Sequence, residues 1–214
     1  MSSLKRGSDT IASPWARLIG RIETAPGGEV YFCCPAWLPT PIGNLQYTAP
    51  TDPSEAPAFY GGFTVAYADG GRFRAAPAAV DPRVTTVVFI PPDALETTVA
   101  RGLLPATVSH EDAARNAGRA ALLVTALGSR PELLLAATED RLHQDYREPA
   151  MPRSLELVRD LRAAGLPAVV SGAGPTVLAF TDATDQDEVA RLVPDGWRAL
   201  TLSVERTGAE VVQG

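Results

Sequence analysis

Hydrophobic and polar residues alternate regularly only from about Gly61 onward. The segment FTVAY (63–67) alternates as a half-buried strand does. ADGG (68–71) supplies turn residues that tolerate positive φ, and RFRAAPAAV (72–80) is the returning strand of the hairpin. VTTVVFI (84–90) is a continuous apolar run, which is typical of a buried strand. The pattern therefore predicts a β-hairpin followed by a buried strand.

Beyond residue 90 the apolar spacing changes to three or four residues, which indicates helices. Asp93 with Glu96, and Ser109 with Asp112, have the spacing of capping boxes and predict two helix starts. The expected helices cover 93–103, 109–128, 131–144, 151–165 and 185–193.

The helix expected over 109–128 has apolar residues at the spacing of a buried stripe. Gly128 and Gly165 are expected to stop this helix and the one over 151–165, because glycine is favoured just past a helix end. The residues of the expected stripe are Ala113, Ala117, Ala120, Val124 and Leu127.

The last third of the chain predicts further strands. PAVVSGAGPTVLAF (167–180) reads as two apolar strands around a glycine-rich turn, and WRALTLSVE (197–205) and GAEVV (208–212) as two more. A few strands with helices grouped between them indicate an α+β fold, with helices packed on one face of a mostly antiparallel sheet.

Residues 1–57 have a different texture, rich in Pro, Gly, Ser and Thr. Such frequent prolines interrupt helices and central strands alike, so we expect an irregular segment. Only RLIGRIE (17–23) and EVYFCC (29–34) predict short strands, joined through the turn-like APGG.

Composition narrows the class of protein. The chain has 214 residues, 45% hydrophobic and 21% charged, which is ordinary for a globular protein. Its formal net charge of −6 argues against a nucleic-acid partner, because phosphate backbones need a basic face. Cys33 and Cys34 are adjacent and match no zinc-site spacing, so no metal site is expected. Neither a signal peptide nor a membrane-length apolar run occurs, which predicts a cytoplasmic protein with no membrane contact.

The sharpest local signal is the SGAGPT turn between two apolar strands. Ser171, Gly172 and Gly174 allow a backbone to approach a bound group closely, as in anion-binding nests, although a plain tight hairpin uses the same residues. It is no Walker loop, because no GK[ST] follows, and no dinucleotide fingerprint, because a strand follows.

Two charged helical segments supply further candidates. Thr97 and Arg101 lie at i and i+4, so a hydroxyl and a guanidinium share one helical face that could bind a carboxylate or phosphate. Arg147 lies close to Pro149 at a helix end, which would fix it on a rigid turn. Judged from the residues alone, a solvated charged face is the simpler explanation of each segment. His143 is one of only two histidines, so a three-histidine metal site is excluded.

Taken together, five strings resemble one family. YGGFTVAY, ETTVARGLLP, NAGRAALLV, ATEDRLHQDYREPAMP and SGAGPTVLAF occur in the order and spacing of bacterial homoserine kinases, members of the GHMP kinase superfamily. The resemblance covers about residues 58–214. It implies that 58–92 are a remnant of the N-terminal kinase lobe and that 93–214 form a GHMP C-terminal domain, a ferredoxin-like α/β sandwich.

The same resemblance implies an activity. The family phosphorylates the side-chain hydroxyl of L-homoserine from ATP with Mg²⁺, in threonine biosynthesis, mainly by positioning and charge stabilisation. Thr97 and Arg101 would lie at the amino-acid site, Arg101 and Arg147 would bind the substrate carboxylate, and the Gly174 loop would lie beneath it. No residue is identified as catalytic.

The front of the chain departs from the family pattern. Neither a PATSANLGPGFD-like string nor a GLGSSAA-like phosphate loop occurs in 1–57, so no cofactor-binding residue is recognised there. Two alternatives to a working kinase follow from this. The chain is a catalytically inactive, truncated remnant, or it is a substrate-side subunit that binds an amino acid or a partner chain. The expected assembly is a homodimer or a complex with a partner chain.

Overall fold

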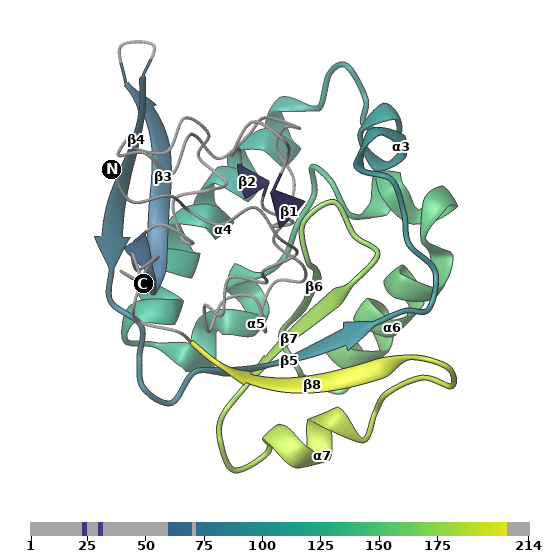
Figure 1. Cartoon of the computed structure of the whole chain (residues 1–214). Coiled ribbons are helices and arrows are strands. Elements are labelled where there is room, and N and C mark those ends of the chain that lie inside the picture. The colour runs from purple at the N-terminus through teal and green to yellow at the C-terminus, as the bar shows by residue number, and fades with distance from the viewer. Residues whose placement is uncertain (1–22, 25–29, 32–59, 70–71, 205–214) are drawn as a thin grey trace, which may run out of the picture. The chain divides into compact units, whose positions relative to one another are not determined.

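The computed structural model describes residues 23–24, 30–31, 60–69 and 72–204 (Figure 1). The chain divides into two compact units, one of Met1–Ala78 with Glu205–Gly214 and one of Ala79–Val204. The sequence-based division at residues 58 and 93 stays a prediction. The strand expected over 208–212 lies outside the described residues.

The first unit contains two antiparallel pairs of strands. β1 (Glu23–Thr24) pairs with β2 (Val30–Tyr31). β2 lies within the second strand predicted there, whereas β1 shares only Glu23 with the first. β3 (Phe63–Asp69) pairs with β4 (Arg72–Ala78) over seven residues, which confirms the predicted hairpin.

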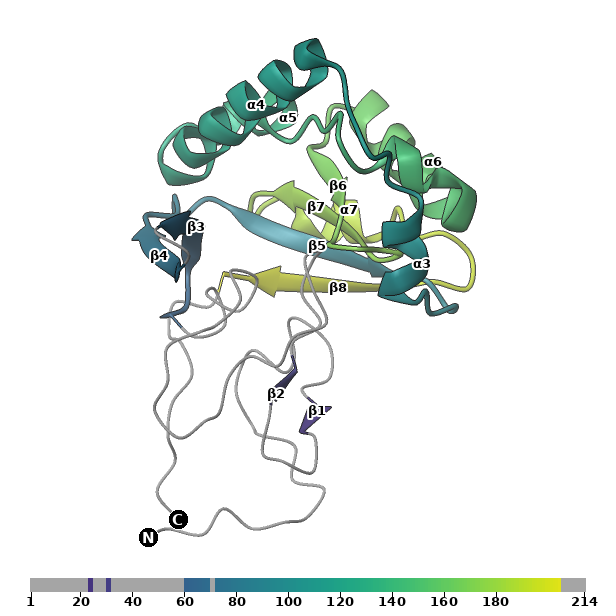
Figure 2. The same ribbon diagram turned by 90° about the horizontal axis from the view of Figure 1, so that it is seen from above.

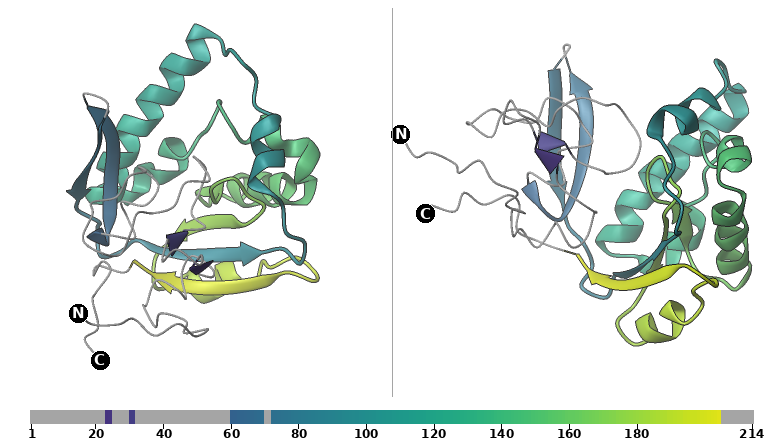
Figure 3. Two further views of the ribbon diagram at one scale, coloured as in Figure 1. Left: turned by 45° about the horizontal axis from the view of Figure 1, so that its top comes forward. Right: turned by 45° about the vertical axis from the view of Figure 1, so that its right-hand side comes forward.

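The second unit is built on a four-stranded sheet in the order β6-β7-β5-β8, antiparallel at every pairing (Figure 1). Helices α3 to α6 lie in the connection between β5 and β6, and α7 lies between β7 and β8 (Figure 3). This order is the ferredoxin-like arrangement, and it confirms the predicted α+β class. The strands are β5 (Thr85–Ile90), β6 (Ala168–Val170), β7 (Val177–Thr181) and β8 (Arg198–Ser203).

The core lies between one face of this sheet and helices α6 (Pro152–Ala163) and α7 (Gln186–Ala190), seen from above in Figure 2. Val87 and Phe89, two residues apart on β5, are both 0% exposed, because alternate side chains of a strand share a face. Burying each such side chain contributes about 1.5–3 kcal/mol. The opposing helices provide Leu155, Val158, Leu161 and Val189.

Helix α6 ends in a Schellman motif at the predicted glycine. Gly165 has φ 85°, its N–H donates to the Arg162 carbonyl at 3.0 Å, and the Leu166 N–H donates to the Leu161 carbonyl at 2.9 Å. The next residue, Leu166, packs against the core, so this stop also directs the chain into β6.

Two glycine-to-alanine substitutions are expected to act in opposite directions. Neither a Cβ at Gly165 nor one at Gly118 meets an atom within 4 Å. The effect of each substitution on the free energy of unfolding therefore depends on backbone conformation alone. Gly165→Ala places alanine at positive φ and should lower the free energy of unfolding by about 1 kcal/mol. Gly118→Ala, inside α4, should raise it by about 0.5–1 kcal/mol. Urea unfolding measures both, and equal shifts of one sign would contradict the assignment.

The helix starts were predicted with mixed success. Ser109 caps α4 (His110–Gly128) and accepts from the Asp112 N–H at 3.0 Å, which confirms this capping box. The capping box at Asp93 is wrong. Helix α3 (Thr97–Gly102) has Glu96 as its N-cap, in an extended conformation with no side-chain cap, so the residues from Asp93 to Glu96 precede the helix.

The buried stripe predicted for α4 is largely wrong. Leu127 is buried, whereas Ala117, Ala120 and Val124 are exposed. The inward face includes polar Asn116 and Arg119, which bond the segment after α5, and that contact sets the rotation of α4 more than small alanines do. Gly128 is the last helical residue and Ser129 is the C-cap, so Gly128 is not the stop just past the helix end that was predicted.

The single helix predicted over 131–144 is also wrong. The chain instead forms a 3-10 turn at Pro131–Leu133, helix α5 (Leu134–Ala137), a series of turns, and a second 3-10 segment, η3 (Asp145–Ala150). The Asp140 carboxylate accepts the backbone N–H groups of the next turn, and this local bonding competes with a continuous helix.

Candidate functional site

Arg147 is the most unusual side chain of the second unit. It lies on η3, is only 2% exposed, and donates from Nη1 to the Gly172 carbonyl at 2.6 Å. Its Nε is buried without a hydrogen-bond partner in the described structure. A buried donor left unpaired costs about 1–3 kcal/mol, so this Nε points to an acceptor supplied by a ligand.

The charges around Arg147 indicate the same kind of ligand. Burial lowers the pKa of the Arg147 guanidinium, the charge of Asp140 raises it, and the nearby positive charge of Arg101 lowers it again, so that the pKa is lowered overall. Two guanidinium groups that repel each other in a partly desolvated region favour an anion that contacts both.

Arg101 reaches this region from α3, which packs next to η3. It is half-buried, in the last turn of α3, and Thr97 is the exposed first residue of the same helix. The structure thus brings Arg101 close to Arg147, with Thr97 one turn away. Their roles toward a substrate stay a prediction.

The glycine-rich turn links β6 to β7 as predicted. The Ser171 N–H donates to the Thr176 carbonyl at 2.7 Å, and the Gly174 N–H donates to the Ser171 carbonyl at 3.1 Å. Two side chains from outside brace the turn: Arg147 at the Gly172 carbonyl, and Ser154 Oγ, which donates to the Pro175 carbonyl at 2.6 Å. The carbonyls of this turn therefore accept from η3 and α6.

Asp140 and Gln144 take part in this arrangement, and sequence reasoning missed both. Asp140 accepts from the backbone N–H groups of Leu142, His143 and Gln144 and contacts the His143 ring at 3.1 Å. Burial raises the pKa of the Asp140 carboxyl, but these hydrogen bonds outweigh it and the pKa is lowered. An aspartate two to four residues before unbonded N–H groups is the turn signal that could have revealed it.

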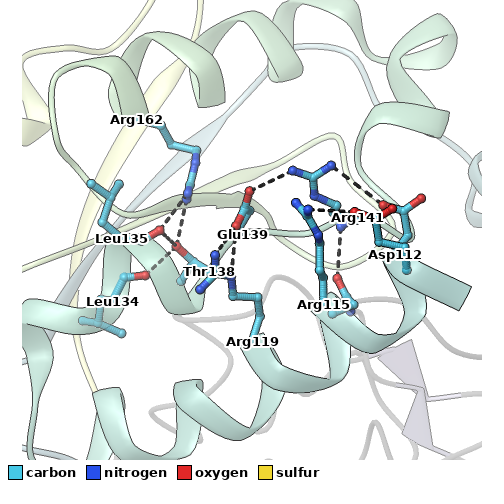
Figure 4. A network of polar contacts seen from close by, with 11 residues as sticks. Asp112, Arg115, Arg119, Leu134, Leu135, Thr138, Glu139, Arg141 and Arg162 are labelled. Carbon is cyan, nitrogen blue, oxygen red and sulfur yellow. Dashed lines mark hydrogen bonds and ion pairs between the residues drawn. The ribbon is translucent and has the colours of Figure 1, made fainter.

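A second polar network lies beside this turn (Figure 4). Glu139 accepts from Arg119 Nε at 2.9 Å and from Arg141 Nη2 at 3.4 Å, and the hydrogen bond from Arg119 lowers the pKa of Glu139. Arg162 donates to Thr138 Oγ1 at 2.9 Å and to the Leu135 carbonyl at 2.7 Å. These bonds attach the end of α5 to α4 and α6, and so fix the base from which the Asp140 turn starts.

The solvated-face interpretation is correct for some of these charges and not for others. The side chains of Arg141 and Asp145 are 43% and 78% exposed, as expected of a charged surface, whereas Arg147 is buried. No group of three or more His, Cys, Asp or Glu side chains able to bind a metal occurs among the described residues. Among the same residues, no helix has the length and apolar character needed to cross a bilayer.

Comparison with known proteins defines the class. Residues 110–199 match the family described as GHMP kinases C terminal. Among solved structures, homoserine kinase from Cytophaga hutchinsonii superposes with a TM-score of 0.68 at 20% identity, over 74% of this chain and 53% of that chain. This likeness shows a common fold. Residues 110–199 of the second unit are therefore similar to a GHMP kinase C-terminal domain.

Within that class the sequence is similar to one kind of enzyme. A homoserine kinase of Streptomyces avermitilis is 57% identical over 157 residues, and one of Streptomyces coelicolor is 53% identical over 157 residues. Each match covers 73% of this chain, and 52% and 51% of the respective relative. The C-terminal part of the chain is thus similar to homoserine kinases, in line with the predicted resemblance. The chain spans about half the length of these relatives.

Proposed function

We propose that this chain binds L-homoserine through Arg101 and Arg147 and serves the ATP-dependent phosphorylation of the homoserine hydroxyl in threonine biosynthesis. The observation that carries the proposal is the Arg147 guanidinium, which is 2% exposed, bonded at Nη1 and unpartnered at Nε. A cytoplasmic location stays a prediction.

A carboxylate suits this pair of arginines better than a neutral ligand. Guanidinium groups bind carboxylates through paired, charge-assisted hydrogen bonds, which are about twice as strong as neutral ones. The negative charge would also offset the repulsion between Arg101 and Arg147. The Thr97 hydroxyl, one turn from Arg101, is available to a further polar group of the amino acid.

The nucleotide side of the reaction has less support. The family implies ATP with Mg²⁺. Among the described residues no three His, Cys, Asp or Glu side chains gather into a group that could bind a metal, and the sequence contains no GLGSSAA-like string. The missing string leaves the phosphate side of a magnesium nucleotide without the residues that the family uses for it. This favours a second candidate function, a substrate-side unit that binds the amino acid and acts with a partner chain or a second copy.

Calorimetry and an assay of ADP release separate the two candidates. Titration with homoserine should show binding to the chain, and titration with ATP and Mg²⁺ tests the nucleotide side. Binding of homoserine with ADP release above the blank supports a kinase. Binding without ADP release supports the substrate-side unit. If homoserine does not bind at all, the proposed function is wrong.

Arg101→Ala is expected to weaken homoserine binding about tenfold or more, because a hydrogen bond to a charged group contributes about 1.5–3 kcal/mol. Isothermal titration measures the change. Arg115→Ala on α4 is the matched control, since this arginine is 55% exposed and pairs with Glu111 within its own helix. It should leave affinity unchanged, and an equal loss in both variants would contradict a specific role of Arg101.

A further inference from the structure

We propose that Asp140 is a positioning residue, which sets the place and the charge environment of Arg147. The ligand part of this inference rests on the proposed function, whereas the positioning itself does not. In the described structure no hydrogen bond or ion pair joins Asp140 to Arg147, so Asp140 acts through the turn that it builds and through its charge.

Both carboxylate oxygens of Asp140 are committed to the segment that leads into η3. Oδ1 accepts from the Leu142 N–H at 3.1 Å, and Oδ2 accepts from the N–H groups of His143 at 3.1 Å and Gln144 at 2.7 Å. The side chain is only 17% exposed, so water competes little for these bonds. One side chain therefore fixes three successive backbone groups.

Gln144 transmits this placement to the arginine. It is the N-cap of η3, and its carbonyl accepts from the Arg147 N–H at 3.0 Å. Its side-chain Oε1 accepts from the Val170 N–H at 2.6 Å, while Arg147 Nη1 donates to Gly172. The turn is thus attached to the glycine-rich loop on both sides of Ser171, and Arg147 is held between two anchored points.

Asp140 also supplies the opposing charge. Arg147 is buried and lies within the influence of a second cation, Arg101, and of the groups that shift its pKa only Asp140 raises it. Removing this negative charge leaves the repulsion between the two arginines without compensation. We expect the Arg147 side chain to lose order in that case, because a mobile guanidinium regains hydration.

The test replaces Asp140 with asparagine, which keeps the size but loses the charge and one acceptor oxygen. Hydrogen exchange of the Arg147 Nε–H is followed by ¹⁵N NMR, with its signal assigned by its loss in Arg147→Lys. Exchange of the Val87 and Phe89 amides, at the centre of the core, reports global opening. Asp145→Asn is the matched control, since Asp145 is in the same segment but 78% exposed.

In Asp140→Asn the Arg147 Nε–H should exchange at least about tenfold faster, while exchange of the core amides is unchanged. The Kd for homoserine should rise about tenfold, because one hydrogen bond to a charged group is lost. Asp145→Asn should change neither. Unchanged Nε–H exchange in Asp140→Asn overturns the proposal, as does equal acceleration of the core amides, which marks a purely structural role. If the unmodified chain binds no homoserine, the proposed function fails, but the exchange measurement still decides the positioning.

Discussion

Gly174→Ala is expected to lower the free energy of unfolding of the second unit by about 2–4 kcal/mol, from a strained backbone and an overpacked core. Gly174 has φ 90°, where an alanine is strained. A Cβ at this position would lie 2.5 Å from Met151 Sδ, 2.6 Å from Met151 Cε and 3.0 Å from Val170 Cγ1. Urea unfolding followed by circular dichroism measures the loss.

A control separates backbone strain from the clash. Gly196 has φ 79°, but a Cβ there meets no atom within 4 Å. Gly196→Ala should therefore lower stability by only about 1 kcal/mol. Combining Gly174→Ala with Met151→Ala should lower stability by less than the sum of the single changes, because the methionine is one of the clashing groups. Equal losses for the two glycine variants would show that the loop has room for a side chain.

The strands were predictable because burial of a strand requires apolar residues at consecutive or alternate positions of the sequence. Val87, Val88 and Phe89 form a continuous apolar run, and both faces of β5 are largely shielded. The glycine-rich turn was predictable for a similar reason, since positive φ at Gly172 and Gly174 restricts the residue type. In both cases the local structure depends on residue types within the segment itself.

The predictions failed where contacts with side chains of other segments determine the local structure. The predicted rotation of α4 rested on alanines, which gain little from burial. Arg119 and Asn116, by contrast, bond residues twenty and twenty-five positions away. The predicted helix over 131–144 ignored Asp140, whose carboxylate bonds three N–H groups of the following turn. Neither set of contacts produces a periodic pattern of hydrophobic residues, so neither can be recognised from the sequence.

The candidate site was predictable only through the family resemblance. Spacing alone placed Thr97 and Arg101 on one helical face, and it gave Arg147 no feature beyond a position near a proline. The burial of Arg147 depends on the glycine-rich loop, twenty-five residues later, whose Gly172 carbonyl accepts its proton. Such a contact between distant segments appears only in the folded chain.

Arg147→Lys is expected to weaken homoserine binding about a hundredfold, because two charge-assisted hydrogen bonds of about 1.5 kcal/mol each are lost. Lysine keeps the positive charge, so charge alone does not explain such a loss. A single ammonium group cannot donate to the Gly172 carbonyl and also present a planar pair of donors to a carboxylate. Calorimetry measures the affinity, and thermal unfolding shows whether the fold is retained.

Arg159→Lys is the control for this substitution. Arg159 forms two bonds with Glu148, at 2.5 and 2.6 Å, but its side chain is 52% exposed. Exposed pairs contribute about 0–1 kcal/mol. The affinity of the Arg159→Lys variant for homoserine and its unfolding temperature should therefore barely change. An Arg147→Lys variant that binds homoserine within twofold of the unmodified chain would show that the buried guanidinium is a structural brace for the glycine-rich loop. In that case the unpaired Nε would need another acceptor.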